Sequence, residues 1–256
     1  MDKKFLFVCG CPRSGTTALW RLMVAHPRIV LGVERYVLFA HQKNKLTPEL
    51  YEKQKFFDLQ PKETFYKNLV EFSRYYETAF KRFDRAEWVG DKIPLLFSRY
   101  EDIETTMPGA NIIFIVRNII DVAASYQKRA DLGTWSKDKD YKQAVAEWRQ
   151  SIERTLEFTA NKDRKIRVHV ISYEDLFLQT ADLRPLFDRL DLDVASEVQT
   201  QYRKLIEKSD QLDANRGDGL TSSKRQYVAL NAPFAEYRDI LDRRLILPAQ
   251  QASPVN

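Results

Sequence analysis

A short apolar run near the start of the chain leads directly into a loop framed by two glycines. Residues 4–9 read KFLFVC, residues 10–17 read GCPRSGTT, and residues 16–26 carry leucine and methionine at helical spacing. The loop has the G-x-x-x-x-G frame of a phosphate-binding loop, in which backbone N–H groups and the helix dipole face an anion. We therefore predict a phosphate site formed by consecutive residues: Ser14, Gly15, Thr16 and Thr17.

Further apolar runs of strand length alternate with stretches of helical character. The expected strands lie at residues 29–31, 88–92, 111–116 and 166–171, and the clearest expected helices at 16–26, 98–106 and 141–161. This alternation favours an α/β fold, a central parallel sheet flanked by helices, with ligands at the carboxyl ends of its strands. We expect a single domain over residues 1–256 and a flexible loop over residues 210–225.

Aromatic residues are frequent between Thr47 and Arg85. Their spacing from Phe65 to Phe83 fits one amphipathic helix. Two interpretations remain open. The rings either pack that helix on the core or line an acceptor pocket beside the phosphate loop.

Charge and composition limit the classes of partner. The 41 lysines and arginines are dispersed among 36 acids, so the net charge of +5 gives no reason to expect nucleic-acid binding. The first apolar run ends at Cys11, which is too short for a secretion signal or a membrane span. We therefore expect a cytoplasmic protein without stable membrane insertion. The two cysteines have no neighbours of metal-ligand spacing, and no metal site is expected.

The loop departs from that of nucleoside triphosphatases in an informative way. Thr16 stands where such loops carry lysine, and Arg13 supplies a positive charge instead. A nucleoside triphosphate needs that lysine on its outer phosphates together with Mg²⁺. A donor with a single 5′-phosphate that bears a sulfuryl group needs neither.

PRSGTT, followed by a helix, the pair HP and a glutamate, resembles the 5′-phosphosulfate loop of sulfotransferases that use 3′-phosphoadenosine 5′-phosphosulfate (PAPS). A second segment, VRNIIDVAASY, resembles the part of that family that binds the donor's 3′-phosphate, with Arg117 at a strand end and Ser125 on the next helix. The likeness extends from about residue 4 to 190 and is greatest to bacterial and Golgi-type carbohydrate and tyrosylprotein enzymes. It implies the phosphate-loop fold of nucleotide hydrolases.

The resemblance also implies catalytic residues. Glu34 in HPRIVLGVERY matches the family's general base, and Lys92 in GDKIP matches the lysine that contacts the sulfuryl and bridging oxygens, with Arg13 beside them. The alternatives are a surface glutamate in a turn and a solvated lysine at a strand end. His26 and His41 are expected to be structural or surface residues.

The tail matches the family less well. Many sulfotransferases close over the donor with a basic, glycine-containing segment, and GLTSSKRQY at residues 219–227 is the candidate here. Either Lys224 or Arg225 is then expected to reach the 3′-phosphate. Residues 210–256 as a whole are expected to be partly flexible or to cover the donor.

The predicted activity is transfer of the sulfuryl group of PAPS to a hydroxyl acceptor, which is a sugar, a lipid, a tyrosine or a small metabolite. The other product is 3′-phosphoadenosine 5′-phosphate (PAP), and no metal is required. Two alternatives come from other classes. One is a phosphate-loop kinase that acts on a small molecule, and the other is a nucleotide-binding protein without catalysis.

Overall fold

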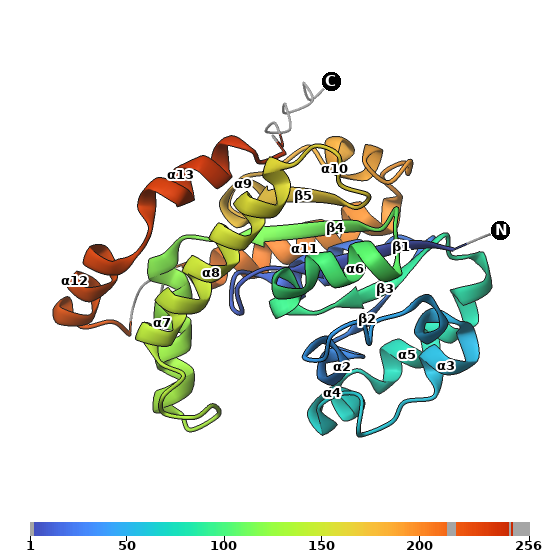
Figure 1. Ribbon diagram of the computed structural model, residues 1–256, viewed down its shortest axis with the longest axis horizontal. Coiled ribbons are helices and arrows are strands. Elements are labelled where there is room, and N and C mark those ends of the chain that lie inside the picture. Colours follow the sequence, from blue (N-terminus) through green and yellow to red (C-terminus); the bar gives the residue numbers. More distant parts are fainter. Residues whose placement is uncertain (1–2, 214–218, 246, 248–256) are drawn as a thin grey trace.

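A computed structural model describes residues 3–213, 219–245 and 247. Five short parallel strands form one sheet in the order β2-β3-β1-β4-β5 (Figure 1). Their bounds are β1 (Lys4–Cys9), β2 (Ile29–Val33), β3 (Trp88–Lys92), β4 (Asn111–Val116) and β5 (Arg167–Ser172). The expected central parallel sheet is therefore confirmed, with β1 in its middle.

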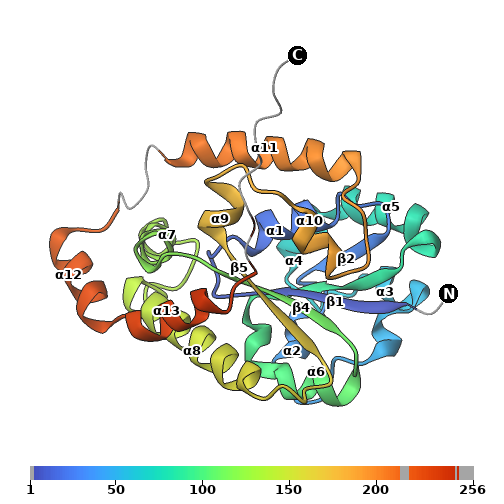
Figure 2. The ribbon, with the colours of Figure 1, turned by 90° about the horizontal axis from the view of Figure 1, so that it is seen from above.

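Helices cover both faces of the sheet, which is why β2, β3 and β4 are buried along their whole length. The strand side chains alternate between two core clusters, one on each face. Figure 2 shows α9, α10 and α11 on one side of the sheet and α6 and α8 on the other.

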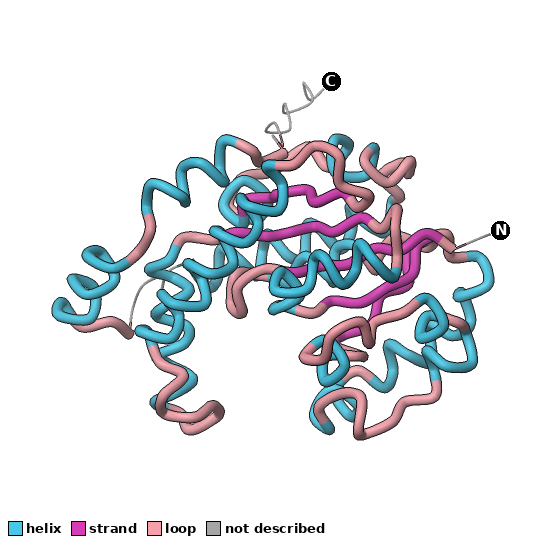
Figure 3. Tube along the Cα trace, viewed as in Figure 1, coloured by secondary structure: helices cyan, strands magenta, loops and turns pink. Residues whose placement is uncertain are grey.

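Thirteen α-helices and three 3₁₀ helices lie within the described residues, and Figure 3 shows how they surround the strands. Before β4 these are α1 (Thr16–Met23), α2 (Val37–Ala40), η1 (Pro48–Tyr51), α3 (Lys53–Phe57), α4 (Tyr66–Glu71), α5 (Ser73–Arg82), η2 (Phe83–Arg85), η3 (Pro94–Arg99) and α6 (Tyr100–Thr106). After β4 they are α7 (Ile119–Asp131), α8 (Tyr141–Ala160), α9 (Tyr173–Phe177), α10 (Arg184–Asp188), α11 (Ser196–Asp213), α12 (Ser222–Asn231) and α13 (Phe234–Asp242).

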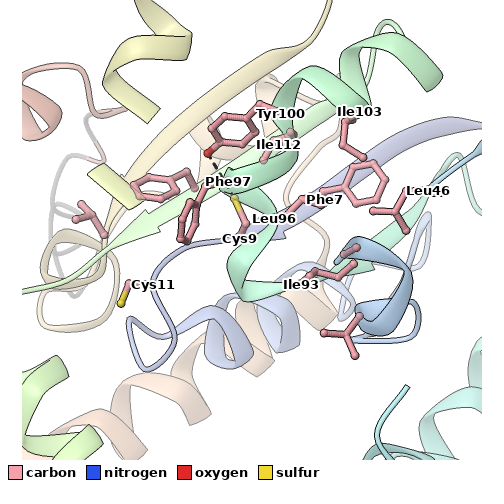
Figure 4. Packing of buried hydrophobic residues seen from close by; sticks show 14 of the residues in the cluster. Phe7, Cys9, Cys11, Leu46, Ile93, Leu96, Phe97, Tyr100, Ile103 and Ile112 are labelled. Atoms are coloured by element: carbon pink, nitrogen blue, oxygen red, sulfur yellow. Dashed lines mark hydrogen bonds between the residues drawn. The ribbon is translucent and has the colours of Figure 1, made fainter. Parts of the chain in front are cut away.

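The core beneath the phosphate loop is aromatic and aliphatic, and it includes a chain of paired polar groups. Cys9 at the end of β1 lies 3.6 Å from the hydroxyl of Tyr100, which in turn lies 3.0 Å from the Thr155 hydroxyl (Figure 4). Burial raises the pKa of Cys9 to about 12, so this cysteine is a packing residue and not a nucleophile.

Three sequence predictions were wrong in detail. The first helix ends at Met23 and not at residue 26, because the chain already turns ahead of Pro27. The single helix expected from Phe65 to Phe83 is divided at Phe72, which has non-helical backbone angles. The stretch 210–225 is not a loop at its two ends, since α11 runs to Asp213 and α12 begins at Ser222, while the described residues 219–221 are non-helical as expected.

The aromatic residues of this region mostly pack together. Phe56 lies with its ring centroid 5.0 Å from that of Phe57, 6.0 Å from Phe83 and 6.2 Å from Tyr76. The interpretation as helix packing is thus confirmed for these rings. Among the helices of the described ranges, none combines the length and apolar character needed to cross a bilayer.

Candidate active site

Four strands end at the same edge of the sheet, and every catalytic residue predicted from the sequence lies there. The phosphate loop follows β1, Glu34 follows β2, Lys92 ends β3, and Arg117 follows β4. Parallel strands share one carboxyl edge, so residues separated by more than a hundred positions meet at this edge. The fold therefore brings the predicted donor and acceptor groups into one region.

The phosphate loop is shaped by Gly15, which caps α1 with a φ of 96°. A Cβ atom at this position would lie 2.4 Å from Cδ2 of Tyr173, so only glycine fits. Ser14 is fully buried, and within the described chain its hydroxyl has no hydrogen-bond partner. Thr16 is buried and Thr17 half-buried at the first turn of α1. A buried unpaired hydroxyl beside a helix N-terminus is suited to an anion.

Arg13 joins the phosphate loop to α7. Its backbone has a φ of 72°, and its Nε donates a hydrogen bond of 2.8 Å to Oγ of Ser125. Burial, together with the neighbouring cations Arg129 and Arg117, lowers the pKa of Arg13 to about 10. A cluster of like charges held together in this way is favourable only when an anion binds among them.

Arg117 is held from three sides. Its Nη2 lies 3.1 Å from Oδ2 of Asp121, its guanidinium carbon lies 4.2 Å from the ring centroid of Tyr173, and its carbonyl accepts the indole N–H of Trp148 at 2.9 Å. Its buried Nε has no hydrogen-bond partner among the described residues. That donor remains available to a ligand.

Tyr173 is a site residue that the sequence reasoning did not single out. Its ring packs against Gly15 and against the Arg117 guanidinium. Tyr173 thus connects the phosphate loop with the end of β4. The available signal was the segment ISYEDL at residues 171–176, which lies within the stretch that resembles the family. A tyrosine one residue after a strand gives no local sign that it will reach two distant loops.

Glu34 and Lys92 form an ion pair. Lys92 Nζ lies 2.6 Å from Oε1 of Glu34, and the lysine side chain is 2% exposed while that of the glutamate is 23% exposed. Glu34 takes a φ of 53°, its backbone N–H donates to the Lys92 carbonyl at 2.8 Å, and its carbonyl accepts from Thr64 Oγ1 at 2.6 Å. Lys92 is therefore a buried, ion-paired residue, and the alternative of a solvated lysine at the strand end is wrong.

The tail residues Lys224 and Arg225 belong to α12, which packs against α7. Lys224 lies 5.5 Å from the ring centroid of Tyr141 and lines a surface hollow of about 370 Å³ together with Gln127 on α7. Gln127 is two residues from Ser125, so the two side chains point about 200° apart around the helix. Lys224 therefore lies beside Gln127 on α7. Arg225 donates from Nε to the carbonyl of Leu220 at 3.3 Å.

The histidines and cysteines show no catalytic arrangement. His26 is buried, lies 3.1 Å from the Asp193 carbonyl, and has its pKa lowered mainly by burial. His41 is exposed beyond α2. Residues 3–213 and 219–247, where described, contain no cluster of three or more histidine, cysteine or acidic side chains able to hold a metal ion.

Comparisons with known proteins agree with this geometry. The profile of the sulfotransferase family matches residues 6–196. No protein with a curated description matches the sequence. Among solved structures, a sulfotransferase domain from the curacin biosynthetic pathway is similar with a TM-score of 0.55 and 19% identity, covering 96% of this chain and 99% of that one.

Two bacterial structures are similar to the same degree. A sulfotransferase from Alicyclobacillus acidocaldarius has a TM-score of 0.51 and 18% identity, over 96% of this chain and 98% of that one. The sulfotransferase STF9 from Mycobacterium avium has a TM-score of 0.51 and 15% identity, over 95% and 78%. At such identities the structures support the fold, and the profile match over most of the sequence supports the family. The chain belongs to the sulfotransferase family.

Proposed function

We propose that the protein transfers the sulfuryl group of PAPS to a hydroxyl acceptor and releases PAP. The observation that carries this proposal is the contact between Arg13 and Ser125, because it joins the phosphate loop to the second predicted phosphate site. A donor with phosphates at both its 5′ and 3′ ends needs two such sites side by side. A nucleoside triphosphate does not.

In this proposal the donor is bound by backbone and side chains together. The N–H groups from Ser14 to Thr17 and the Arg13 guanidinium hold the 5′-phosphosulfate. Arg117 and Ser125 hold the 3′-phosphate. The unpaired Ser14 hydroxyl and Arg117 Nε support this assignment, since each is a buried polar group that a phosphate oxygen would satisfy.

Glu34 acts as general base and Lys92 as the electrostatic partner of the leaving group. The acceptor oxygen attacks sulfur, the bond between sulfur and the bridging oxygen of the 5′-phosphate breaks, and the acceptor's proton passes to the Glu34 carboxylate. Negative charge then develops on the bridging oxygen, where the ammonium of Lys92 stabilises it. The ion pair between them supports a shared location for both tasks.

The ion pair also suggests that the donor binds before Glu34 accepts the acceptor's proton. A lysine engaged with the donor's bridging oxygen leaves the Glu34 carboxylate, which then becomes available to the acceptor's proton. Lys92 therefore holds Glu34 in place before the donor arrives and releases it afterwards.

We further propose that catalysis requires no metal, since the phosphate loop offers Arg13 where a triphosphate loop relies on lysine and Mg²⁺. A covering action of the tail on the donor, by Lys224 or Arg225, stays a prediction. So do the single-domain organisation of residues 1–256 and the cytoplasmic location.

The proposed function is tested by incubating the protein with [³⁵S]PAPS and a metabolite and glycan extract, in the presence of a chelator. We expect label to appear in one class of hydroxyl-bearing compound. Labelling from [γ-³²P]ATP with Mg²⁺ in place of PAPS would instead support the kinase alternative.

A further inference from the structure

A buried carboxylate on β3 contacts the turn that follows β2, and these two segments carry the proposed catalytic pair. Asp91 precedes Lys92 on β3, and its side chain is fully buried. Its Oδ1 accepts the backbone N–H of Arg35 at 3.1 Å, and its Oδ2 accepts that of Tyr36 at 2.9 Å. These two N–H groups immediately follow Glu34.

The chain has to bend over Asp91 in order to make these bonds. Glu34 adopts a left-handed conformation with a φ of 53°, which is unfavourable for a residue other than glycine. Gly32, the register partner of Asp91, leaves room for the carboxylate, since a Cβ there would lie 2.7 Å from Asp91 Oδ1. The unfavourable backbone of Glu34 is therefore held by bonds that only an acceptor with two oxygens provides.

Neighbouring residues on a strand point to opposite faces, so Asp91 and Lys92 project on opposite sides of β3. Asp91 fixes the turn from one side, and the Glu34 carboxylate meets the Lys92 ammonium at 2.6 Å on the other. The position of the base thus depends on a residue that does not itself touch the base.

Arg35, which follows Glu34 in the turn, is itself held by several buried contacts. Arg35 donates to the carbonyls of Phe56 at 3.0 Å and Asp58 at 2.7 Å, and its guanidinium pairs with the buried Glu63. A buried charged network of this kind is not needed for stability alone, because apolar residues of similar size often serve as well. Its residues instead hold one specific backbone geometry next to Glu34.

We propose that Asp91 is the positioning residue of the Glu34–Lys92 pair. This inference rests on the roles proposed above for those two residues. Asp91 holds the turn after β2 so that the Glu34 carboxylate is placed beside Lys92 before the donor binds and faces the acceptor afterwards.

The test is the variant Asp91→Asn, which keeps the size of the side chain but accepts only one of the two N–H groups. We expect the rate of label transfer at saturating [³⁵S]PAPS, into the compound class labelled in the extract, to fall by about 10- to 100-fold. The affinity for PAP, measured by calorimetry, should change less than about twofold, because Asp91 is not part of the proposed donor site.

A double variant separates positioning from general damage. If Asp91 acts through Glu34, then adding Asp91→Asn to Glu34→Gln should lower the rate by less than about twofold further. Independent losses that multiply in the double variant would overturn the proposal. Asn111→Ala serves as the control, since it breaks a buried hydrogen bond to His169 at the opposite end of the sheet and should leave the transfer rate unchanged.

Hydrogen exchange tests the turn without any activity. The amides of Arg35 and Tyr36 should exchange at least about tenfold faster in Asp91→Asn than in the wild type, and Glu34→Gln should leave them slow. Unchanged exchange would contradict the proposal, and Asp91→Ser offers a second variant if Asp91→Asn does not fold. Absence of any label transfer by the wild type would refute the proposed function alone, because the exchange measurement still decides whether Asp91 holds the turn.

Discussion

Glu34 and Lys92 form an ion pair, but the proposed mechanism gives them different roles, general base and stabilisation of the leaving group. The hydroxyl acceptor must lose a proton, so Glu34→Gln, which keeps the size but removes the proton acceptor, should lower kcat by about 10² to 10⁴. Lys92→Ala should also lower kcat, through lost stabilisation of the leaving group. Glu34→Gln should barely change PAP affinity, because Glu34 is proposed to act on the acceptor.

The pH profile distinguishes the two variants. A general base contributes a rising limb to kcat/KM, which Glu34→Gln should abolish and Lys92→Ala should preserve. Near-normal turnover of Glu34→Gln with an unchanged limb would show that the base lies elsewhere.

We expect Arg117 to contribute to the affinity for the donor's 3′-phosphate. Arg117→Ala should weaken PAP by about ten- to a hundredfold, the usual cost of a lost charge-assisted contact, and should hardly affect adenosine 5′-phosphosulfate, which lacks the 3′-phosphate. Calorimetry with both ligands measures the difference. Arg154→Ala is a suitable control because that arginine pairs with Glu101 on the surface. Equal weakening of both ligands by Arg117→Ala would contradict the assignment.

At the scale of the element, the phosphate loop depends on a glycine for two separate reasons. Gly15 has a positive φ, and a Cβ there would overlap the Tyr173 ring that supports Arg117. Gly133 shares only the first property, since a Cβ there meets nothing within 4 Å. Gly15→Ala should therefore weaken PAP by about tenfold or more, while Gly133→Ala should cost about 1 kcal/mol of stability and leave PAP affinity unchanged. Equal PAP affinities of the two variants would argue against the packing of Tyr173 on the loop.

The turn between β2 and α2 should make stability depend on pH. Burial raises the pKa of Asp91 to about 7, opposed by the two backbone N–H donors and by the charges of Lys92 and Arg35. The folded state then binds a proton that the unfolded state, with a pKa of about 3.9, has already lost. This contribution to stability is present at low pH and declines as the pH rises from about 4 to about 7.

Thermal unfolding measures this effect. Relative to the wild type, Asp91→Asn should reduce the fall in Tm between pH 5 and pH 8 by about 3 °C or more, because asparagine does not titrate. The control Asn111→Ala should lower Tm equally at both values. An identical pH dependence in the wild type and Asp91→Asn would show that Asp91 is ionised throughout this range.

At the scale of the whole molecule, the sequence predicted what local patterns encode. The strands, the phosphate loop and the position of Arg117 follow from apolar runs and the residues that end them, and the structure places them as expected. The contact of Arg13 with Ser125 could not be predicted, because it spans 112 positions and depends on how α7 packs. Asp91 escaped notice since one carboxylate inside GDKIP carries no local sign of burial.

Errors in the sequence reading came from tertiary effects on helices. Continuous helical spacing from Phe65 to Phe83 hides the break at Phe72, whose ring packs edge-on against Trp20 at 5.6 Å. The polar composition of residues 210–225 suggests a loop, yet α11 and α12 extend into this stretch. Packing against the core decides such segments more than composition does.

Donor binding should stabilise the entire domain, since the phosphate loop, β4, α7 and Tyr173 all contribute to one site. A ligand at a hundred times its Kd adds about 2.7 kcal/mol, which for a protein of this size raises Tm by about 5 to 10 °C. We expect PAP to produce this shift equally with EDTA and with Mg²⁺, because Arg13 and the loop amides supply the charge that a metal supplies to a triphosphate. ATP with Mg²⁺ should shift Tm far less. A large shift with ATP that disappears in EDTA, together with none from PAP, would instead point to a triphosphate site, and the Arg13–Ser125 contact would then serve only to pack α7 against the loop.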